Sequence, residues 1–275
     1  MTLIPDIRAN VAAALQEDLR DGDLTALLLP QEQMATARVI SRQTAVLCGT
    51  LWFEECFLSL DPGCEIHWTA QEGATVQPDE LLCEIRGHAR ALLSAERAAL
   101  NFLQTLSGTA TLVHRYVEAV AGTQAKIMDT RKTLPGLRVA QKHAVRTGGG
   151  HNQRIGLFDG VLIKENHITA AGSIRAVLEQ AFRITPQGYH PDRSGKYGAA
   201  RRGTQRRCPA DPAGQFSLVD MRTAVTHAAK RAELEASGGI TLDNVRLVAE
   251  TGVDRISVGA LTKDVTAVDL SMRFA

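Results

Sequence analysis

The spacing of apolar residues predicts a helix followed by a group of short strands in the N-terminal third of the chain. Within 6–19, Ile7, Val11 and Leu15 recur at helical spacing and form one apolar stripe. Between 35 and 86 the pattern changes to brief runs, TARVISR, TAVLCG, CEIHWTA and ELLCEIRG, which are typical of strands. We therefore expect a β-rich N-terminal domain with a helix in front of its strands.

The stretch 88–122 predicts two helices. Leu92 and Leu103 belong to one apolar face at helical spacing. Gly108 interrupts this pattern and Gly122 closes it. The first helix is therefore expected to end near Gly108, and the second near Gly122.

The second half of the chain repeats a short apolar run, a polar loop and a helix. AKIMD leads into TRKTLPGLR, GVLI into KENH, AELEA into SGG, and RISVG into ALTKD. Such repeats indicate parallel strands joined by crossover helices. In a (β/α) barrel built from these units, the active site lies at the C-terminal mouth of the strands. We therefore expect an α/β fold with its chemistry in the loops that follow the strands.

Composition excludes several functional classes. The chain has 275 residues, of which 44% are hydrophobic, so it can form two domains or one large one. A net charge of +1 and an aromatic content of 4% argue against a nucleic-acid surface, and no apolar run approaches a membrane span. The N-terminal residues lack a basic-then-apolar signal pattern, so a cytoplasmic protein is expected.

The cysteines and histidines do not favour a zinc site. The eight histidines include no H-E-x-x-H pattern, and each is expected to be structural. The cysteines include no C-x-x-C pair and fit reduced, mostly buried thiols. They are Cys48, Cys56, Cys64, Cys83 and Cys208.

Cations are concentrated in the loops after the predicted strands. These are Arg131, Lys132, Arg138, Lys142, Arg146, Arg154 and Lys164. In a nearly neutral protein, cations gathered at one mouth need an anionic ligand to offset their repulsion. Arginine binds planar carboxylates bidentately and lysine suits phosphates, so the predicted ligand is polyanionic. Arg138, Lys142 and Arg146 have helical spacing beyond the strand, and we expect these three to face solvent.

Two glycine-containing turns end the late strands, SGG at 237–239 and VGA at 258–260. Turns of this kind after late barrel strands bind phosphate through main-chain N–H groups. Either motif alone is more often an ordinary turn. Their occurrence after consecutive strands predicts a phosphate site.

Several of these motifs resemble one enzyme family along almost the whole chain. DTRKTLPGLR, AVRTGGGHNQRIGLFDGVLIKENHI, LEASGGIT and ETGVDRISVGALTK are similar to quinolinate phosphoribosyltransferase, and EDLRDGDLTALLLP and SAERAALNFLQTLSGTAT resemble its N-terminal half. The resemblance implies an N-terminal α/β sandwich at 1–112, an incomplete (β/α) barrel at 113–264, and a segment at 265–275 that returns to the first domain. It also implies a homodimer that joins quinolinate to phosphoribosyl pyrophosphate with Mg²⁺, releasing CO₂ and pyrophosphate and forming nicotinate mononucleotide for NAD synthesis.

The resemblance assigns roles to individual residues. Arg131 and Arg154 would hold the quinolinate carboxylates, and Arg97 would enter the same pocket from the partner subunit. Lys132 and Lys164 would neutralise the phosphates and the departing pyrophosphate, as the catalytic residues. The residues implied to cradle the ribose phosphate or line the site are Ser237, Gly238, Gly239, Ser257, Gly259 and Ala260.

The chain departs from the family in two places. The family often reads G-G-G-x-N-H-R, and here Gln153 replaces the histidine that lines the quinolinate pocket, so weaker substrate binding is expected. The second departure is 186–215, where nine of thirty residues are Gly or Pro and none is Val, Ile, Leu, Met, Phe or Trp. The family places barrel strands there, with a Glu and an Asp that handle the ribose and Mg²⁺ side of the substrate.

We interpret this second departure as a compensated frameshift. Asp211 to Gln215 can be encoded by GAT CCT GCT GGA CAA, which one base later reads Ile-Leu-Leu-Asp. His190 to Gly195 can likewise be read one base later as Ile-Gln-Ile-Glu-Val-Glu. In that frame Arg193 stands where the Glu belongs, and Gly214 where the Asp belongs.

Three alternatives remain open from the sequence. The stretch 186–215 can instead be a true basic insertion that binds RNA or an acidic partner, although it has few aromatic residues. The enzyme can be a related phosphoribosyltransferase that acts on nicotinate or another ring acid. The chain can also be a catalytically dead paralogue that binds ribose phosphate, since the acidic residues are missing.

Overall fold

The computed structural model describes residues 3–163, 165–184 and 217–275, and the chain divides into two compact units. The first unit comprises Met1–Ala119, Lys132–His151 and Gly259–Ala275, and the second comprises Val120–Arg131 and Asn152–Val258. Each unit has its own sheet. The domain boundaries at 112 and 264 stay predictions.

The first unit is built on a four-stranded antiparallel sheet with the order β3-β5-β1-β9. Its strands are β1 (Met34–Ser41), β3 (Glu65–Trp68), β5 (Leu81–His88) and β9 (Leu270–Phe274). The short strands β2 (Ala45–Val46) and β4 (Thr75–Val76) form a separate antiparallel pair. The predicted β-rich N-terminal region is therefore confirmed, and β9 shows that the C-terminal end of the chain completes its sheet.

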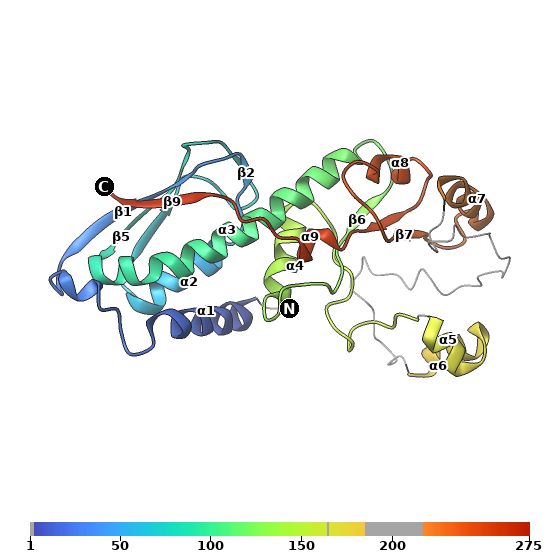
Figure 1. Ribbon diagram of the computed structural model, residues 1–275, viewed down its shortest axis with the longest axis horizontal. Coiled ribbons are helices and arrows are strands. Elements are labelled where there is room, and N and C mark those ends of the chain that lie inside the picture. The colour runs from blue at the N-terminus through green and yellow to red at the C-terminus, as the bar shows by residue number, and fades with distance from the viewer. Residues whose placement is uncertain (1–2, 164, 185–216) are drawn as a thin grey trace. The chain divides into compact units, whose positions relative to one another are not determined.

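The helices of this unit pack on the sheet and on one another. They are α1 (Ile4–Leu19), the 3₁₀ turn η1 (Ala26–Leu28), α2 (Thr50–Leu60), α3 (Ala89–Ala119), α4 (Arg138–Thr147) and α9 (Ala260–Lys263), the last two against α3. Figure 1 shows α2 and α3 running along the sheet, with α1 beside them. Trp52, Phe53 and Phe57 of α2 are fully buried, as are Leu103 and Leu106 of α3. Burial of such large apolar side chains is the main stabilising contribution to this unit.

The prediction of two helices in 88–122 is wrong, because α3 runs without a break from Ala89 to Ala119. Gly108 lies inside the helix and is needed for close packing. A Cβ atom at Gly108 would lie 2.1 Å from the main-chain oxygen of Thr266, which is too close for any side chain. This glycine is therefore a contact point between α3 and the segment before β9, and it does not end a helix.

The expected buried thiols are confirmed within the described part of the chain. Cys48, Cys56, Cys64 and Cys83 are free and buried. Burial raises the pKa of Cys56 to about 12 and that of Cys64 to about 11, with nearby acidic groups adding to both shifts. These thiols are therefore protonated and unreactive at neutral pH. Cys208 lies outside the described residues.

The second unit contains a three-stranded parallel sheet with the order β6-β8-β7, as predicted for this half. Its strands are β6 (Lys126–Met128), β7 (Glu235–Ser237) and β8 (Arg255–Ser257), and its helices are α5 (Glu165–Ala171), α6 (Ile174–Ile184), α7 (Leu218–Ala228) and α8 (Val245–Ala249). Ile127, Ala236 and Ile256 are buried and pair in one row across the sheet. The fold is thus α/β in both units.

One predicted strand is absent from the described residues. GVLI at 160–163 forms no strand, and Val161 and Leu162 are 42% and 50% exposed. A parallel strand is stabilised by hydrogen bonds to its neighbours, and no described segment pairs with this one. The stretch 186–215, from which the family would supply further strands, lies outside the described residues.

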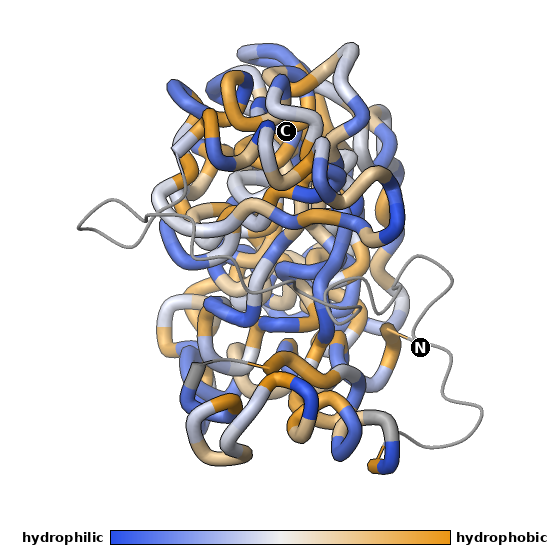
Figure 2. Tube along the Cα trace, turned by 90° about the vertical axis from the view of Figure 1, so that its right-hand side faces the viewer, coloured by the Kyte–Doolittle hydropathy of each residue, from blue (hydrophilic) through white to orange (hydrophobic). Residues whose placement is uncertain are grey.

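Apolar and polar positions alternate along the trace of both units. Figure 2 shows hydrophobic and hydrophilic segments interspersed throughout the described chain. Within 3–163, 165–184 and 217–275, no helix is both long enough and apolar enough to cross a membrane.

Candidate active site

The strands of the second unit place their C-terminal ends at one edge of the sheet. Met128 of β6 pairs with Ser257 of β8, and Ser257 pairs with Ser237 of β7. Because the three strands are parallel, the loops that follow them leave from the same edge. Asp129 and Arg131 follow β6 at this edge, as the sequence pattern predicted.

Arg131 and Arg154 lie close enough in this unit to repel each other electrostatically. Burial lowers the pKa of the Arg154 guanidinium, repulsion from Arg131 lowers it further, and Asp159 opposes the change. Arg131 Nε is buried and has no hydrogen-bond partner among the described residues. A buried donor left without a partner is costly, so an anionic ligand would stabilise this pair.

The loop that carries Arg154 is held by its own hydrogen bonds. Arg154 Nη1 donates to the main-chain oxygen of Gly160 at 2.6 Å. Asp159 accepts from the amides of Ile155 and Gly156 at 2.7 and 2.8 Å. The side chain of Arg154 is therefore positioned by a short turn and not by a regular element.

Gln153 joins this loop to two strands. Its side-chain Nε2 donates to Glu235 Oε2 at 2.6 Å and to Ser257 Oγ at 3.3 Å. Its main-chain amide donates to Asp129 Oδ1 at 2.7 Å, and Asp129 is fully buried. Sequence reasoning named Gln153 and Ser257 but missed the two carboxylates. These carboxylates are Asp129, which ends AKIMD, and Glu235, which lies near the end of AELEA. Their positions at predicted strands were the signal in the sequence that could have identified them.

The SGG motif forms an open turn after β7. Gly238 and Gly239 have φ values of 96° and 63°, a conformation that favours glycine. A Cβ atom at Gly238 would meet nothing within 4 Å, so the space beside it is open. Asn244 Nδ2 donates to the main-chain oxygen of Gly239 at 2.9 Å and holds the turn in place. The turn can therefore accept a ligand against its main chain.

The remaining predicted site residues belong to the first unit or are not described. Lys132 is exposed, and its main-chain oxygen accepts from Thr262 Oγ1 at 2.8 Å. Gly259 and Ala260 are half-buried at the start of α9, and Arg97 is exposed on α3. The predicted residues that lie outside the described part of the chain are Lys164, Arg193 and Gly214.

The prediction that Lys142 faces solvent is wrong. We expected Lys142 to face solvent, but it is only 2% exposed. Arg146 is exposed as expected, and Arg138 is half-buried. Helical spacing was misleading because α4 is buried around most of its circumference. The buried residues of α4 other than Lys142 are Ala140, Gln141, Ala144 and Val145.

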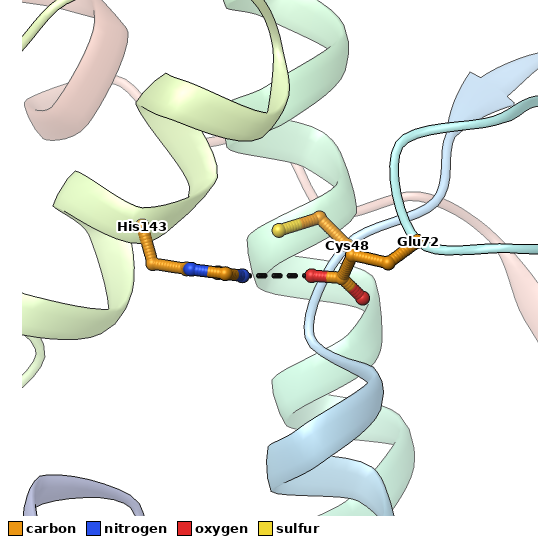
Figure 3. A group of neighbouring side chains, drawn as sticks. All are labelled: Cys48, Glu72 and His143. Carbon is orange, nitrogen blue, oxygen red and sulfur yellow. Dashed lines mark hydrogen bonds and ion pairs between the residues drawn. The ribbon is translucent and has the colours of Figure 1, made fainter. Parts of the chain in front are cut away.

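A cluster in the first unit has the atom types of a metal site. Cys48, Glu72 and His143 each offer one ligand atom within 4.8 Å of the others (Figure 3). The oxygens of Glu72 already accept from the amides of Gly49 and Thr50, from Thr50 Oγ1 and from His143 Nε2. Burial, together with the charge of Glu72, raises the pKa of the Cys48 thiol well above its usual value, whereas metals bind the thiolate. We interpret the cluster as a hydrogen-bonded cap on the first turn of α2.

Comparison with protein families identifies the chain. Residues 23–107 match the family model for the quinolinate phosphoribosyl transferase N-terminal domain, and residues 109–189 and 214–273 match the model for its C-terminal domain. The chain belongs to this quinolinate phosphoribosyl transferase family. The family match stops at 189 and resumes at 214, so the unmatched stretch falls inside the segment that departs from the family in sequence.

Individual members of the family agree along the full length. The nicotinate-nucleotide pyrophosphorylase [carboxylating] of Mycobacterium leprae is 38% identical over 277 residues, covering 96% of this chain and 96% of the relative. A probable enzyme of the same name from Bacillus subtilis is 36% identical over 265 residues, covering 93% of this chain and 89% of the relative. The solved structure of the nicotinate-nucleotide pyrophosphorylase from Francisella tularensis has a TM-score of 0.85 at 36% identity, covering 98% of this chain and 96% of that one.

Proposed function

We propose that this chain joins quinolinate to phosphoribosyl pyrophosphate and releases CO₂ and pyrophosphate, forming nicotinate mononucleotide for NAD synthesis. The observation that carries this proposal is the pair Arg131 and Arg154. The two guanidinium groups repel each other, and one has a buried donor without a described partner. A ring that carries two carboxylates supplies two anions to this pair, and each carboxylate can accept two parallel hydrogen bonds from a guanidinium.

The phosphoribosyl donor is proposed to bind beside the late strands. The main-chain N–H groups of Ser237, Gly238 and Gly239 are suited to the 5-phosphate, and the resemblance to the family assigns Gly259 and Ala260, at the start of α9, to the same group. Lys132 and Lys164 are proposed to neutralise the pyrophosphate as it leaves, a role that for Lys164 rests on its motif alone. Mg²⁺ enters as the complex with phosphoribosyl pyrophosphate and is therefore part of the substrate.

These groups suit a reaction that needs positioning and charge neutralisation more than a strong nucleophile. The quinolinate nitrogen forms a bond to C1 of the ribose, and the C1–oxygen bond breaks with its electron pair going to pyrophosphate. The cationic ring then accepts the electron pair of the adjacent C–CO₂⁻ bond as CO₂ leaves. A proton is added at that carbon. Arg131 and Arg154 hold the ring acid in place through both steps.

The proposal includes a homodimer in which Arg97 reaches the quinolinate site of the partner subunit. Arg97 is exposed on α3, so it is available for such a contact. A cytoplasmic location stays a prediction, which fractionation of the source cells would test.

The decisive experiment supplies quinolinate or nicotinate with phosphoribosyl pyrophosphate and Mg²⁺ and measures nicotinate mononucleotide and CO₂. We expect product from quinolinate with one CO₂ for each nucleotide, and none from nicotinate. Nucleotide formed from nicotinate without CO₂ would contradict the proposal. Binding of phosphoribosyl pyrophosphate without any product would instead identify a chain that binds but does not catalyse.

A further inference from the structure

Glu235 joins the start of β7 to Ser257 at the end of β8 and to Gln153, which precedes Arg154. It lies at the start of β7, and each of its oxygens accepts from a different residue. Oε1 accepts from Ser257 Oγ at 2.6 Å, and Oε2 accepts from Gln153 Nε2 at 2.6 Å. Gln153 Nε2 also donates to Ser257 Oγ at 3.3 Å, so the three side chains form a closed set of hydrogen bonds.

Gln153 is thereby fixed at both ends. Its main-chain amide donates to the buried Asp129, and its side chain donates to Glu235. Arg154 follows directly in the chain, and the amides of the next two residues, Ile155 and Gly156, donate to Asp159. The side-chain hydrogen bond to Glu235 therefore links β7 to the loop that carries Arg154.

Glu235 places a negative charge close to the proposed binding site of a dianion. A carboxylate near a site for a dianion weakens the binding of that dianion by repulsion unless hydrogen bonds satisfy it. Here both oxygens are satisfied, and hydrogen bonds to a carboxylate are stronger than those to a neutral acceptor. A carboxylate is also the one side chain that accepts from two donors on two oxygens while donating to neither.

We propose that Glu235 is a positioning residue for the ring acid: through Gln153 it orients the Arg154 loop and so sets the affinity for quinolinate, not the affinity for phosphoribosyl pyrophosphate. This inference rests on the proposed function, because it takes quinolinate as the ligand of Arg154. Glu235 itself does not touch the ligand. Its effect must therefore disappear when the side chain of Gln153 is removed.

The test measures the dissociation constants of quinolinate and of phosphoribosyl pyrophosphate by calorimetry on the full chain. Glu235→Ala is expected to raise the dissociation constant of quinolinate about tenfold or more, which corresponds to the loss of one charge-assisted hydrogen bond. The dissociation constant of phosphoribosyl pyrophosphate should change by less than about twofold, which is too little for a lost hydrogen bond. Glu235→Gln retains one acceptor oxygen and should recover most of the affinity.

Glu233→Ala is the matched control. Glu233 lies two residues before Glu235, just ahead of β7, and forms an ion pair with Arg255 at the start of β8. Its removal takes away a carboxylate of β7–β8 without touching Gln153. We expect both dissociation constants to stay at their original values in this variant.

A double variant tests whether Glu235 acts on quinolinate binding through Gln153. In the Gln153→Ala background, adding Glu235→Ala should leave the quinolinate affinity unchanged, because the intermediary is already absent. A further loss in that background, or an equal loss of both ligands in Glu235→Ala, would overturn the proposal. If the alanine variant does not fold, Glu235→Asp replaces it in the test. Aspartate keeps the charge, but its shorter side chain moves the carboxylate oxygens away from Gln153 and Ser257. An unchanged quinolinate affinity in Glu235→Asp would also overturn the proposal.

The same measurements separate this inference from the proposed function. Quinolinate binding without turnover would contradict the function and leave the positioning test intact. An unaltered chain that does not bind quinolinate at all would overturn both.

Discussion

His143 Nε2 of α4 lies 2.8 Å from Glu72 Oε1, and Glu72 also accepts from the amides of Gly49 and Thr50 at the start of α2, so Glu72 links the two helices. Burial alone would raise the pKa of Glu72, but hydrogen bonds from His143, Thr50 and the neighbouring amides lower it to about 2. A carboxyl with a lowered folded-state pKa stabilises the protein above its unfolded value near 4.5. That stability is lost as the pH falls from about 4.5 towards 2.

The first prediction follows from the lowered pKa of Glu72. Glu72→Gln should lower the free energy of unfolding by about 1–3 kcal/mol at pH 7, with the difference shrinking below about pH 4. Urea titrations of both proteins between pH 3 and 8 measure it. Glu17→Gln, a change of an exposed carboxylate on α1, is the control and should have little effect. A difference that stays constant down to pH 3 would show that ionisation of Glu72 does not contribute.

The second prediction concerns the geometry of the arginine pair. Arg131→Lys keeps the charge but loses the planar fork, so the quinolinate dissociation constant should rise about tenfold to hundredfold. Calorimetry with quinolinate measures this change. Arg175→Lys on α6 is the control, because Arg175 is solvent-exposed and pairs with Glu179. Equal affinity in Arg131→Lys and the original chain would remove Arg131 from the quinolinate site.

The third prediction concerns position 153. Gln153→His introduces a group that can carry charge, and the quinolinate dissociation constant should fall about threefold to tenfold at pH 6, with a smaller gain at pH 8. Gln153→Met, which cannot donate a hydrogen bond, should bind more weakly than the original chain at both values. A histidine variant whose affinity does not depend on pH would contradict a role for charge at this position.

The fourth prediction tests the packing of α3. Gly108→Ala puts a Cβ atom 2.1 Å from the oxygen of Thr266, and it should lower the free energy of unfolding by about 1–3 kcal/mol or more. Thermal or urea unfolding measures the loss. Gly63→Ala is the matched control, because the nearest atom to its Cβ is 3.4 Å away and its φ is not positive. If both variants are equally stable, the segment before β9 does not constrain α3.

The fifth prediction concerns the source gene across codons 180–220. We expect that, relative to the gene, the printed reading contains one additional base near codon 188 and lacks one base near codon 215, so that the gene itself encodes Arg193→Glu and Gly214→Asp. The family match stops at 189 and resumes at 214, and α7 begins normally with a capping box between Ser217 and Asp220. Sequencing of the gene decides this, and peptide masses from the natural protein that match the printed 186–215 would contradict it.

Residue spacing and motifs were sufficient to predict several elements of both units, the family and the cationic residues after the strands. Strand and helix periods depend on nearest neighbours along the chain, so β1, β5 and α1 could be predicted from residue spacing. The motifs after β6 and β7 also placed Arg131 and Ser237 at strand ends, because parallel strands share one edge.

Which side chains meet, and which glycines form close contacts, depends on how distant segments pack in the folded chain. Gly108 sits within a continuous helix because a distant segment passes against it, and Lys142 is buried although its spacing suggested a solvent face. Glu235 carries no motif of its own. It becomes part of the site because β7 lies beside β8 and brings it to Gln153, 82 residues away in the chain. Such contacts depend on packing between segments remote in sequence, which local patterns do not encode.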